Sequence, residues 1–365
     1  MTGIRQQVDV SLGERSYTIC VGTGLLSQTA ATYMSRGEAV SHVVVISDAN
    51  VTEHADVVAK SWQAAGVRVV RLSVPAGEGS KSIAEADRLW QEMLRCGTDR
   101  KSLVVAVGGG VVGDLAGFVA ATFARGIRFL QIPTTLLAQV DSSVGGKTGI
   151  NLPSAKNMVG AFWQPSFVLI DIDVLSTLPD REYRSGLAEV VKYGVILDAD
   201  FFNYLEAHAA QLNARDPEVL CTIVARCCRL KADVVEQDER ETSGLRAVLN
   251  YGHTFAHAFE AIGGYGQLLH GEAVSIGMVC ASRLAASLGR IDAAMTQRQV
   301  TLLRQLDLPV VVPDLDHQLL CQAMAHDKKV EHGRLRFVLP TRMGHVELVA
   351  DVNSDLVVNA MRDGN

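Results

Sequence analysis

A long unbroken hydrophobic run is absent from this sequence of 365 residues. The most apolar stretch, residues 103–124, is interrupted by Gly108–Gly110 and by Asp114, and the N-terminal residues contain no apolar core of a signal peptide. Neither sign of charge is in large excess, because 34 lysines and arginines stand against 40 aspartates and glutamates. We therefore expect neither a membrane span nor export, and no nucleic acid or anionic membrane as a partner.

The cysteines likewise lack any structural pattern. They number seven, which is odd, and they show neither a CxxC pair nor the spacing of a zinc finger. Such scattered cysteines are typical of reduced core thiols in a cytoplasmic protein. With 48% hydrophobic and 20% charged residues, the composition is that of a soluble globular chain long enough for two domains.

The order of the apolar patterns predicts where these domains lie. Up to about residue 180, short runs rich in β-branched residues alternate with helical patterns, which is typical of a parallel α/β sheet. Later patterns are almost all helical, including one over 246–262, while the runs 333–340 and 344–352 favour a small hairpin. We predict an α/β domain at 1–180 and a mainly α-helical domain at 181–365.

A glycine-rich turn follows one of the predicted strands. In VVAVGGGVVGDLAG, three spaced glycines stand between a strand and a helix, where a bare backbone can approach a pyrophosphate closely. A tight turn without a ligand is the alternative. Two pairs of polar residues after other strands, Asp48 with Asn50 and Glu78 with Lys81, favour a dinucleotide site. Asp48, the candidate carboxylate for the ribose, precedes the glycine turn in the sequence, whereas in the usual Rossmann order the glycine turn comes first. We therefore expect a dinucleotide site of another lineage.

The segment 133–162 carries more polar side chains than a loop requires, and Arg125 lies just upstream of it. A single lysine in a glycine-rich turn is usually a solvated charge. Several cationic and amide groups together favour a pocket for an anionic substrate, above all a phosphate. The side chains concerned are Thr134, Thr135, Asp141, Lys147, Lys156 and Asn157.

Polar residues also recur in the otherwise apolar segment LNYGHTFAHAFE. Asn250, His253 and His257 are three and four residues apart, so on a helix they form one stripe. Arg246 extends this stripe backwards and Glu260 extends it forwards. Histidines satisfied within a core are the alternative, but so many buried polar groups would each need a matched partner. The stripe therefore indicates a polar cavity or a metal site.

Two further motifs offer metal ligands. SGLAEVVKYGVI places Glu189 and Lys192 on an apolar helix, either as a buried salt bridge or as a metal ligand beside an anion contact. LLHGEAVSIG adds His270. One carboxylate and two imidazoles leave an open position, as in a catalytic zinc site. Spacing alone cannot choose the two histidines. Because His253 and His257 are i and i+4, we expect that pair, with His270 as a spare.

Five motifs resemble those of the 3-dehydroquinate synthase family, and they are densest between residues 102 and 280: GGGVVGDLAGFVAATFARGIRFLQIPTTLLAQVDSSVGGKTGIN, KNMVGAFWQP, SGLAEVVKYG, LNYGHTFAHAFE and HGEAVSIGM. The resemblance implies a cytoplasmic homodimer whose subunits combine an N-terminal α/β NAD domain with a C-terminal helical metal domain. It implies that Glu189, His253 and His270 bind Zn²⁺ or Co²⁺, which replaces the i, i+4 pair and leaves His257 beside the substrate.

The resemblance also implies residues for the other two ligands. Those implied for NAD are Asp48, Asn50, Glu78, Lys81, Gly109, Gly110, Asp114, Thr134, Thr135, Lys147, Lys156 and Thr177. Those implied for the substrate are Arg125, Asp141, Lys147, Lys156, Asn157, Lys192, Lys231, Arg246, Asn250, His257 and Lys328. The run 238–246 is one residue longer than the family pattern, which weakens the assignment of Lys231 more than that of Arg246. The neighbouring Lys329 is an alternative to Lys328.

The implied activity is that of a carbon–oxygen lyase in the shikimate pathway of aromatic amino acid biosynthesis. It converts the keto-acid phosphate DAHP to 3-dehydroquinate and phosphate, and NAD is oxidant and then reductant within each turnover. The alternatives are another sugar phosphate cyclase, of the valiolone or deoxyinosose type, or a metal-dependent polyol dehydrogenase. The many cationic residues argue against a neutral polyol, and Lys231, Asn157 and His257 favour a carboxylated substrate.

Overall fold

A computed structural model places the chain in two compact units and describes residues 3–153, 155–264, 267–326 and 335–362. The first unit comprises Met1–Leu178 and Leu220–Arg240, and the second comprises Pro179–Val219 and Glu241–Asn365. By contacts, the segment Leu220–Arg240 belongs with the first unit, whereas the division expected from the sequence assigned it to the second. None of the described helices is both long enough and apolar enough to cross a membrane.

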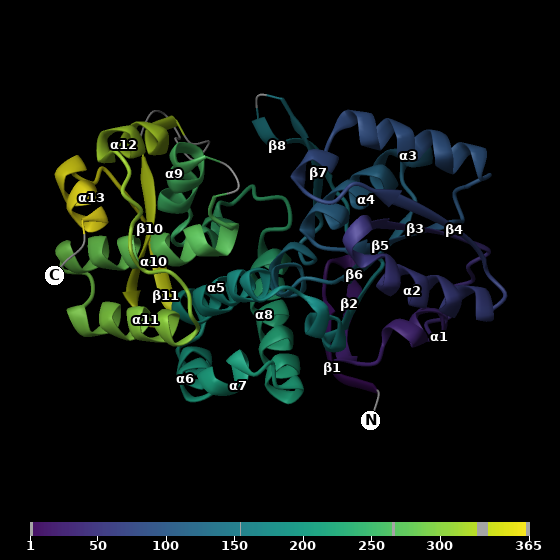
Figure 1. The fold of residues 1–365 in the computed structure, drawn as a ribbon, viewed down its shortest axis with the longest axis horizontal. Helices are drawn as coiled ribbons and strands as arrows, with labels where there is room; N and C mark the ends of the chain where they lie inside the picture. Colours follow the sequence, from purple (N-terminus) through teal and green to yellow (C-terminus); the bar gives the residue numbers. More distant parts are fainter. Residues whose placement is uncertain (1–2, 154, 265–266, 327–334, 363–365) are drawn as a thin grey trace. The chain divides into compact units, whose positions relative to one another are not determined.

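The first unit is built on a seven-stranded sheet in the order β1-β2-β9-β6-β5-β3-β4 (Figure 1). Neighbouring strands are parallel except β1 and β2, which are antiparallel. The predicted parallel α/β sheet is thus confirmed, with an additional antiparallel strand at one edge. The strands are β1 (Gly3–Val10), β2 (Tyr17–Thr23), β3 (His42–Asp48), β4 (Arg68–Val74), β5 (Leu103–Gly108), β6 (Arg128–Pro133) and β9 (Phe167–Asp171).

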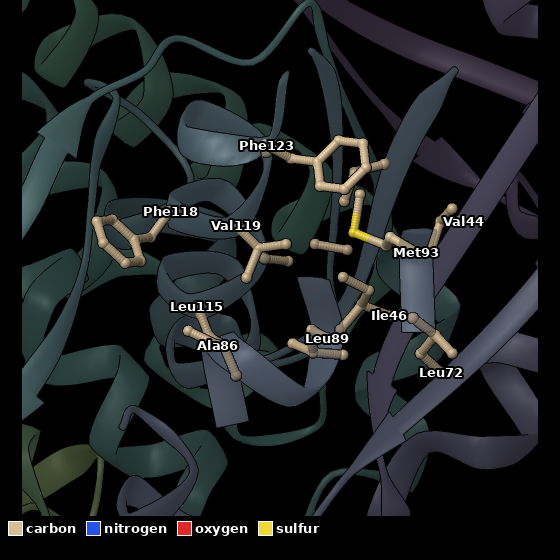
Figure 2. Packing of buried hydrophobic residues seen from close by; sticks show 14 of the residues in the cluster. Val44, Ile46, Leu72, Ala86, Leu89, Met93, Leu115, Phe118, Val119 and Phe123 are labelled. Carbon is tan, nitrogen blue, oxygen red and sulfur yellow. The ribbon is translucent and has the colours of Figure 1, made fainter. Parts of the chain in front are cut away.

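Helices cover both faces of this sheet, with α3 and α4 on one face and α1 and α2 on the other (Figure 1). Strands covered on both sides are apolar throughout, which explains the continuous β-branched runs of the sequence. Figure 2 shows Leu89 and Met93 of α3 and Leu115 of α4 packing with Val44 and Ile46 of β3. Burying each such side chain stabilises the fold by roughly 1.5–3 kcal/mol. The helices are α1 (Thr29–Met34), α2 (Thr52–Ala64), α3 (Ile83–Arg95) and α4 (Gly110–Thr122).

The polar segment between β6 and β9 is more regular than a loop. It forms a π-helix at Ala138–Ser142 and then an antiparallel hairpin of β7 (Lys147–Leu152) and β8 (Ala155–Phe162). The hairpin strands approach closely, because a Cβ at Gly160 would lie 2.2 Å from the carbonyl oxygen of Thr148. Gly160 therefore serves strand pairing in this hairpin.

The second unit is mainly helical, as predicted, and its hairpin of β10 (Arg336–Arg342) and β11 (His345–Ala350) confirms the expected strand pair. The long helix α8 (Pro217–Gln237) begins in the second unit and continues into the first. The other helices are α5 (Asp180–Leu197), α6 (Ala199–Ala207), α7 (Ala209–Asn213), α9 (His253–Gly263), α10 (His270–Ser287), α11 (Ala293–Gln305), α12 (His317–His326) and α13 (Ser354–Met361).

The prediction of one continuous helix over 246–262 is wrong. A 3-10 helix spans Leu245–Asn250, a turn follows, and α9 begins at His253. Gly252 adopts a left-handed φ of 78°, and a Cβ there would lie 2.8 Å from the backbone nitrogen of Met278 in α10. The chain leaves the helical conformation where α9 packs tightly on α10, so Arg246 does not continue the helical stripe.

Candidate functional site

Three helices of the second unit bring Glu189, His253 and His270 together. Each offers one ligand atom, and these atoms all lie within 4.8 Å of one another. Nε2 of His253 lies 3.6 Å from Oε1 of Glu189, and Nε2 of His270 lies 3.7 Å from the same oxygen. This is the trio implied by the family resemblance, and it includes His270 rather than His257.

The spacing of this trio fits a shared cation. Distances of 3.6 and 3.7 Å exceed the usual N–H···O length of about 2.7–3.2 Å. Ligand atoms bound at about 2.0–2.1 Å to a tetrahedral zinc lie roughly 3.3 Å apart. Glu189 is 1% exposed, and neither of its carboxylate oxygens accepts a hydrogen bond from the described part of the chain. A buried carboxylate in this state is costly without a positive charge beside it.

Lys192 supplies one such charge, because its Nζ forms an ion pair with Oε2 of Glu189. A buried salt bridge between Glu189 and Lys192 is therefore compatible with a role of Glu189 as a metal ligand. The lysine holds one oxygen of the carboxylate, while the other oxygen faces both imidazoles. Lys192 is 2% exposed, so its ammonium group lies in the same buried environment as the three candidate ligands.

Both histidines are held through Nδ1, which leaves Nε2 facing Glu189. Nδ1 of His253 lies 3.1 Å from the carbonyl oxygen of Tyr251, and Nδ1 of His270 lies 3.1 Å from Oε1 of Glu260. Burial lowers the pKa of His270, but the hydrogen bond to Glu260 and the charges of Glu189 and Glu260 outweigh it, so this pKa is raised above the ordinary value of a histidine. Surroundings that stabilise a proton on this ring also favour a metal cation.

Glycines allow the ligand helices to approach this closely. A Cβ at Gly271 would lie 1.8 Å from the carbonyl oxygen of Ser185 in α5, and the Gly271 amide donates to the Ser185 hydroxyl at 3.0 Å. A Cβ at Gly277 would lie 2.2 Å from the carbonyl oxygen of Gly252, which precedes α9. Any larger residue would push α10 away from α5 or α9, and thereby separate the histidines from Glu189.

The glycine turn of the first unit leads into the start of α4. Gly109 and Gly110 precede and begin this helix, whose first N–H groups have no helical partners. A Cβ at Gly109 would lie 3.1 Å from Cγ2 of Thr135, and one at Gly110 would lie 3.0 Å from Oγ of Ser142. A side chain at either position would be crowded by Thr135 or Ser142, so small residues suit a turn whose backbone must approach a phosphate.

Lys81 is the centre of a polar cluster beside this turn. Its Nζ, on a side chain that is 4% exposed, lies 2.6 Å from Oδ2 of Asp114 and 2.5 Å from Oδ1 of Asn157. Glu78 lies 3.7 Å from the same nitrogen. Burial raises the pKa of Asp114, although the charge of Lys81 opposes this. Asn151, which the sequence analysis missed, donates to Glu78 at 2.7 Å and accepts the Asn157 amide at 2.9 Å.

The other residues implied for NAD lie at or near strand ends. Asp48 ends β3, and its carboxylate accepts the amide of exposed Asn50 at 2.8 Å. Thr134 is 3% exposed, and its hydroxyl has no partner among the described residues, which is unusual for a buried polar group. The hydroxyl of Thr135 accepts the amide of Ala138 at 3.1 Å. Thr177 is exposed, and its hydroxyl lies 3.0 Å from Nε2 of His54.

Asp141 lies in the π-helix and pairs with Lys231 of α8. The Lys231 ammonium donates to the Asp141 carbonyl oxygen at 2.7 Å and lies 2.9 Å from its carboxylate. Such π-helical turns occur often at functional sites. This pairing places Lys231 beside Asp141, another residue that the family resemblance implies for the substrate.

The remaining candidates of the first unit are exposed. Arg125 ends the 3-10 helix Phe123–Arg125 after α4 with a left-handed φ of 67°, Lys147 begins β7, and Lys156 lies on β8. These cations stand on three different elements. Their proposed roles therefore rest on the family pattern rather than on an assembled pocket.

The remaining candidates of the second unit lie on both sides of the break before α9. Arg246 is 4% exposed and forms an ion pair with Glu241 at 3.2 Å. Asn250 ends the 3-10 helix. The ring of His257 lies 5.7 Å from that of His253, edge to face. Lys328 and its alternative Lys329 lie outside the described residues.

The fold of this chain, an α/β unit followed by a helical unit with a candidate metal site, matches that of sugar phosphate cyclases among the solved structures. A 2-deoxy-scyllo-inosose synthase complexed with carbaglucose-6-phosphate, NAD⁺ and Co²⁺ is 27% identical with a TM-score of 0.88, over 99% of this chain and all of that one. The 2-epi-5-epi-valiolone synthase of Streptomyces hygroscopicus subsp. jinggangensis, with NAD⁺ and Zn²⁺ bound, is 31% identical with a TM-score of 0.86, over 96% of this chain and 97% of that one.

Comparison of sequences specifies the family within this class. Residues 71–185 match the family model of the 3-dehydroquinate synthase N-terminal region, and residues 186–330 match that of the C-terminal region. The 3-dehydroquinate synthase of Rhodopirellula baltica is 54% identical over 368 residues, which is 99% of this chain and 98% of that protein. This chain belongs to the 3-dehydroquinate synthase family.

Proposed function

We propose that this chain converts DAHP to 3-dehydroquinate and phosphate, using NAD⁺ and a divalent metal ion. The observation that carries the proposal is the identity of 54% over 99% of the chain to a 3-dehydroquinate synthase. The identities to the inosose and valiolone synthases are 27% and 31%, which disfavours those two activities. The enzyme is then a lyase of aromatic amino acid biosynthesis.

Glu189, His253 and His270 would hold the metal, and the residues around the glycine turn would hold NAD⁺. Two features of the described residues support these assignments: the Glu189 carboxylate is buried with only Lys192 as an ion-pair partner of one oxygen, and the buried Thr134 hydroxyl has no hydrogen-bond partner. When bound, the metal ion would acidify a substrate hydroxyl, and NAD⁺ would accept a hydride and return it within the same turnover.

The polar side chains of this chain would bind and orient the substrate. In the first unit, Arg125, Lys147, Lys156 and Asn157 would hold the phosphate until it leaves, and one of its own oxygens would accept the proton of the neighbouring C–H bond. Asp141 and Lys231, which are paired at 2.9 Å, would position oxygens of the substrate.

In the second unit, Lys192 would hold a negative oxygen beside Glu189. Arg246 would bind the substrate carboxylate, for which it would exchange its partner Glu241. His257 and Asn250 would anchor the transfer of protons during ring opening and closure. Lys328 would contact the substrate as well. We also propose that the enzyme is a cytoplasmic homodimer, as the family resemblance implies.

The test is to incubate the purified chain with DAHP, a trace of NAD⁺, and Zn²⁺ or Co²⁺. We expect 3-dehydroquinate and phosphate in equal amounts, with no net NADH at steady state. Net NADH formation from a polyol would instead establish a dehydrogenase. Turnover of a phosphosugar that lacks the carboxylate, in preference to DAHP, would establish one of the other cyclases. In His270→Ala, metal retention and activity should be lost together; a variant that keeps stoichiometric zinc would refute the ligand role.

A further inference from the structure

Glu260 is the member of the polar stripe on α9 to which the proposed function assigns no role. Its carboxylate oxygen Oε1 lies 3.1 Å from Nδ1 of His270, which links α9 to the start of α10. The side chain is 18% exposed, so the interaction is partly shielded from water. A carboxylate in this position is common behind metal-binding histidines, because it fixes the ring and strengthens its second nitrogen as a ligand.

The two histidines of the trio differ in how their rings are held. The side chain of His253 is 11% exposed, and its Nδ1 faces the backbone carbonyl of Tyr251, two residues earlier. The side chain of His270 is 36% exposed, and its Nδ1 faces the Glu260 carboxylate. A histidine ring rotates within a broad energy minimum unless packing or a hydrogen bond restrains it. The orientation of His270 therefore depends more on its hydrogen bond than that of His253 does.

The backbone beneath His270 is fixed without Glu260. The close contact of Gly271 with Ser185 holds the start of α10 against α5. Arg181 binds both carboxylate oxygens of Glu272 at 2.7 and 2.8 Å, and Oε2 of Glu272 accepts the amide of Leu269 at 2.8 Å. Removing Glu260 should consequently release the imidazole ring of His270 while the start of α10 stays in place.

We infer that Glu260 is a positioning residue of the metal centre. Its carboxylate accepts a hydrogen bond from Nδ1–H of His270, turns Nε2 towards Glu189 and increases the affinity of Nε2 for a divalent cation through its charge. This inference rests on the metal site of the proposed function and adds a residue that acts through His270. A purely structural ion pair at this exposure would instead change stability only slightly and leave metal binding as it was.

The experiment compares Glu260→Gln and Glu260→Ala with the unaltered chain. Metal-free protein is titrated with Co²⁺ alone, without NAD⁺ or substrate, and the visible absorption gives both the dissociation constant and the coordination of the ion. We expect the dissociation constant to rise about 10–100-fold in the alanine variant. The glutamine variant should lie between the two, because it keeps an acceptor but loses the charge. The Co²⁺ spectrum should change with both substitutions.

A matched control is Glu206→Gln. The carboxylate of Glu206 also belongs to the second unit, but it pairs with Arg298 at 2.5 Å rather than with a candidate metal ligand. Its Co²⁺ affinity should equal that of the unaltered chain. Thermal unfolding of the metal-free proteins shows whether each variant is folded, and the glutamine variant decides the question if the alanine variant is not. Affinities of the Glu260 variants within about threefold of the unaltered chain would overturn the inference, since the expected loss is at least about tenfold. Failure of the unaltered chain to bind Co²⁺ would overturn the proposed metal site itself.

Discussion

Replacing Gly271 with alanine tests whether helix packing creates the metal centre. The added Cβ would lie 1.8 Å from the carbonyl oxygen of Ser185, whereas real Cβ atoms essentially never come closer than 3.0 Å to another heavy atom. The obstructing atom belongs to the backbone of α5, so no side-chain rotation can relieve the contact. The start of α10 must move away from α5.

The size of this movement can be taken from the contact itself. Relief requires at least about 1.2 Å, the difference between 1.8 and 3.0 Å, while metal sites tolerate departures of about 0.2 Å from ideal ligand distances. His270 precedes Gly271 and would move with it, away from Glu189. We expect loss of at least tenfold in Co²⁺ affinity, and about 1–3 kcal/mol in the free energy of unfolding from overpacking.

The assay combines Co²⁺ titration of the metal-free protein with urea unfolding. Gly263→Ala at the end of α9 is the matched control, because the nearest atom to its Cβ would be Cδ1 of Leu315 at 3.8 Å, an ordinary contact. That control should bind Co²⁺ normally. If Gly271→Ala also binds one Co²⁺ per chain with unchanged affinity, close packing of α10 on α5 does not determine the ligand geometry.

Three further predictions concern the first unit. Lys81→Met leaves Asp114 and Asn157 without their shared donor, so NAD⁺ affinity measured by fluorescence titration should fall roughly tenfold or more; unchanged affinity would exclude Lys81 from the site. Gln139 is fully buried and donates to two backbone carbonyls at 3.2 Å. Gln139→Leu would leave both carbonyls without this donor, so the free energy of unfolding should fall by about 1–3 kcal/mol for each carbonyl. An unchanged midpoint of urea unfolding would contradict this. Burial raises the pKa of Cys228 to about 12. In the folded protein this thiol should therefore resist alkylation by iodoacetamide at pH 8, and it should react once the protein is unfolded in urea, as mass spectrometry would show. Rapid labelling of the folded protein would show that α8 opens readily around Cys228.

Sequence periodicity identified the ligand types but could not select among the histidines. His253 and His257 lie on the same helix, so their spacing suggested a pair. His270 approaches Glu189 because Gly271 permits contact with Ser185, 86 residues away in sequence. No local pattern contains such a contact, and the family resemblance was needed to prefer His270.

The break before α9 shows a second limit of periodicity. The spacing of Arg246 and Asn250 relative to His253 is helical, although the chain turns at Gly252. The glycine was visible in the sequence, but its left-handed conformation is imposed by tertiary packing against α10. Long-range polar pairs were likewise beyond prediction from the residues alone, as with Lys81 and Asn157 or Asp141 and Lys231. The strands of the sheet were easier to predict, because burial on both faces gives each a continuous apolar run.

All three candidate metal ligands belong to the helical unit, whereas the glycine turn and the Lys81 cluster belong to the α/β unit. A chelating agent can thus remove the metal ion without altering any described side chain that is a candidate to bind NAD⁺. If occupancy by the ion nevertheless alters how tightly the nucleotide is held, the linkage reports communication through the protein rather than a common set of ligating groups.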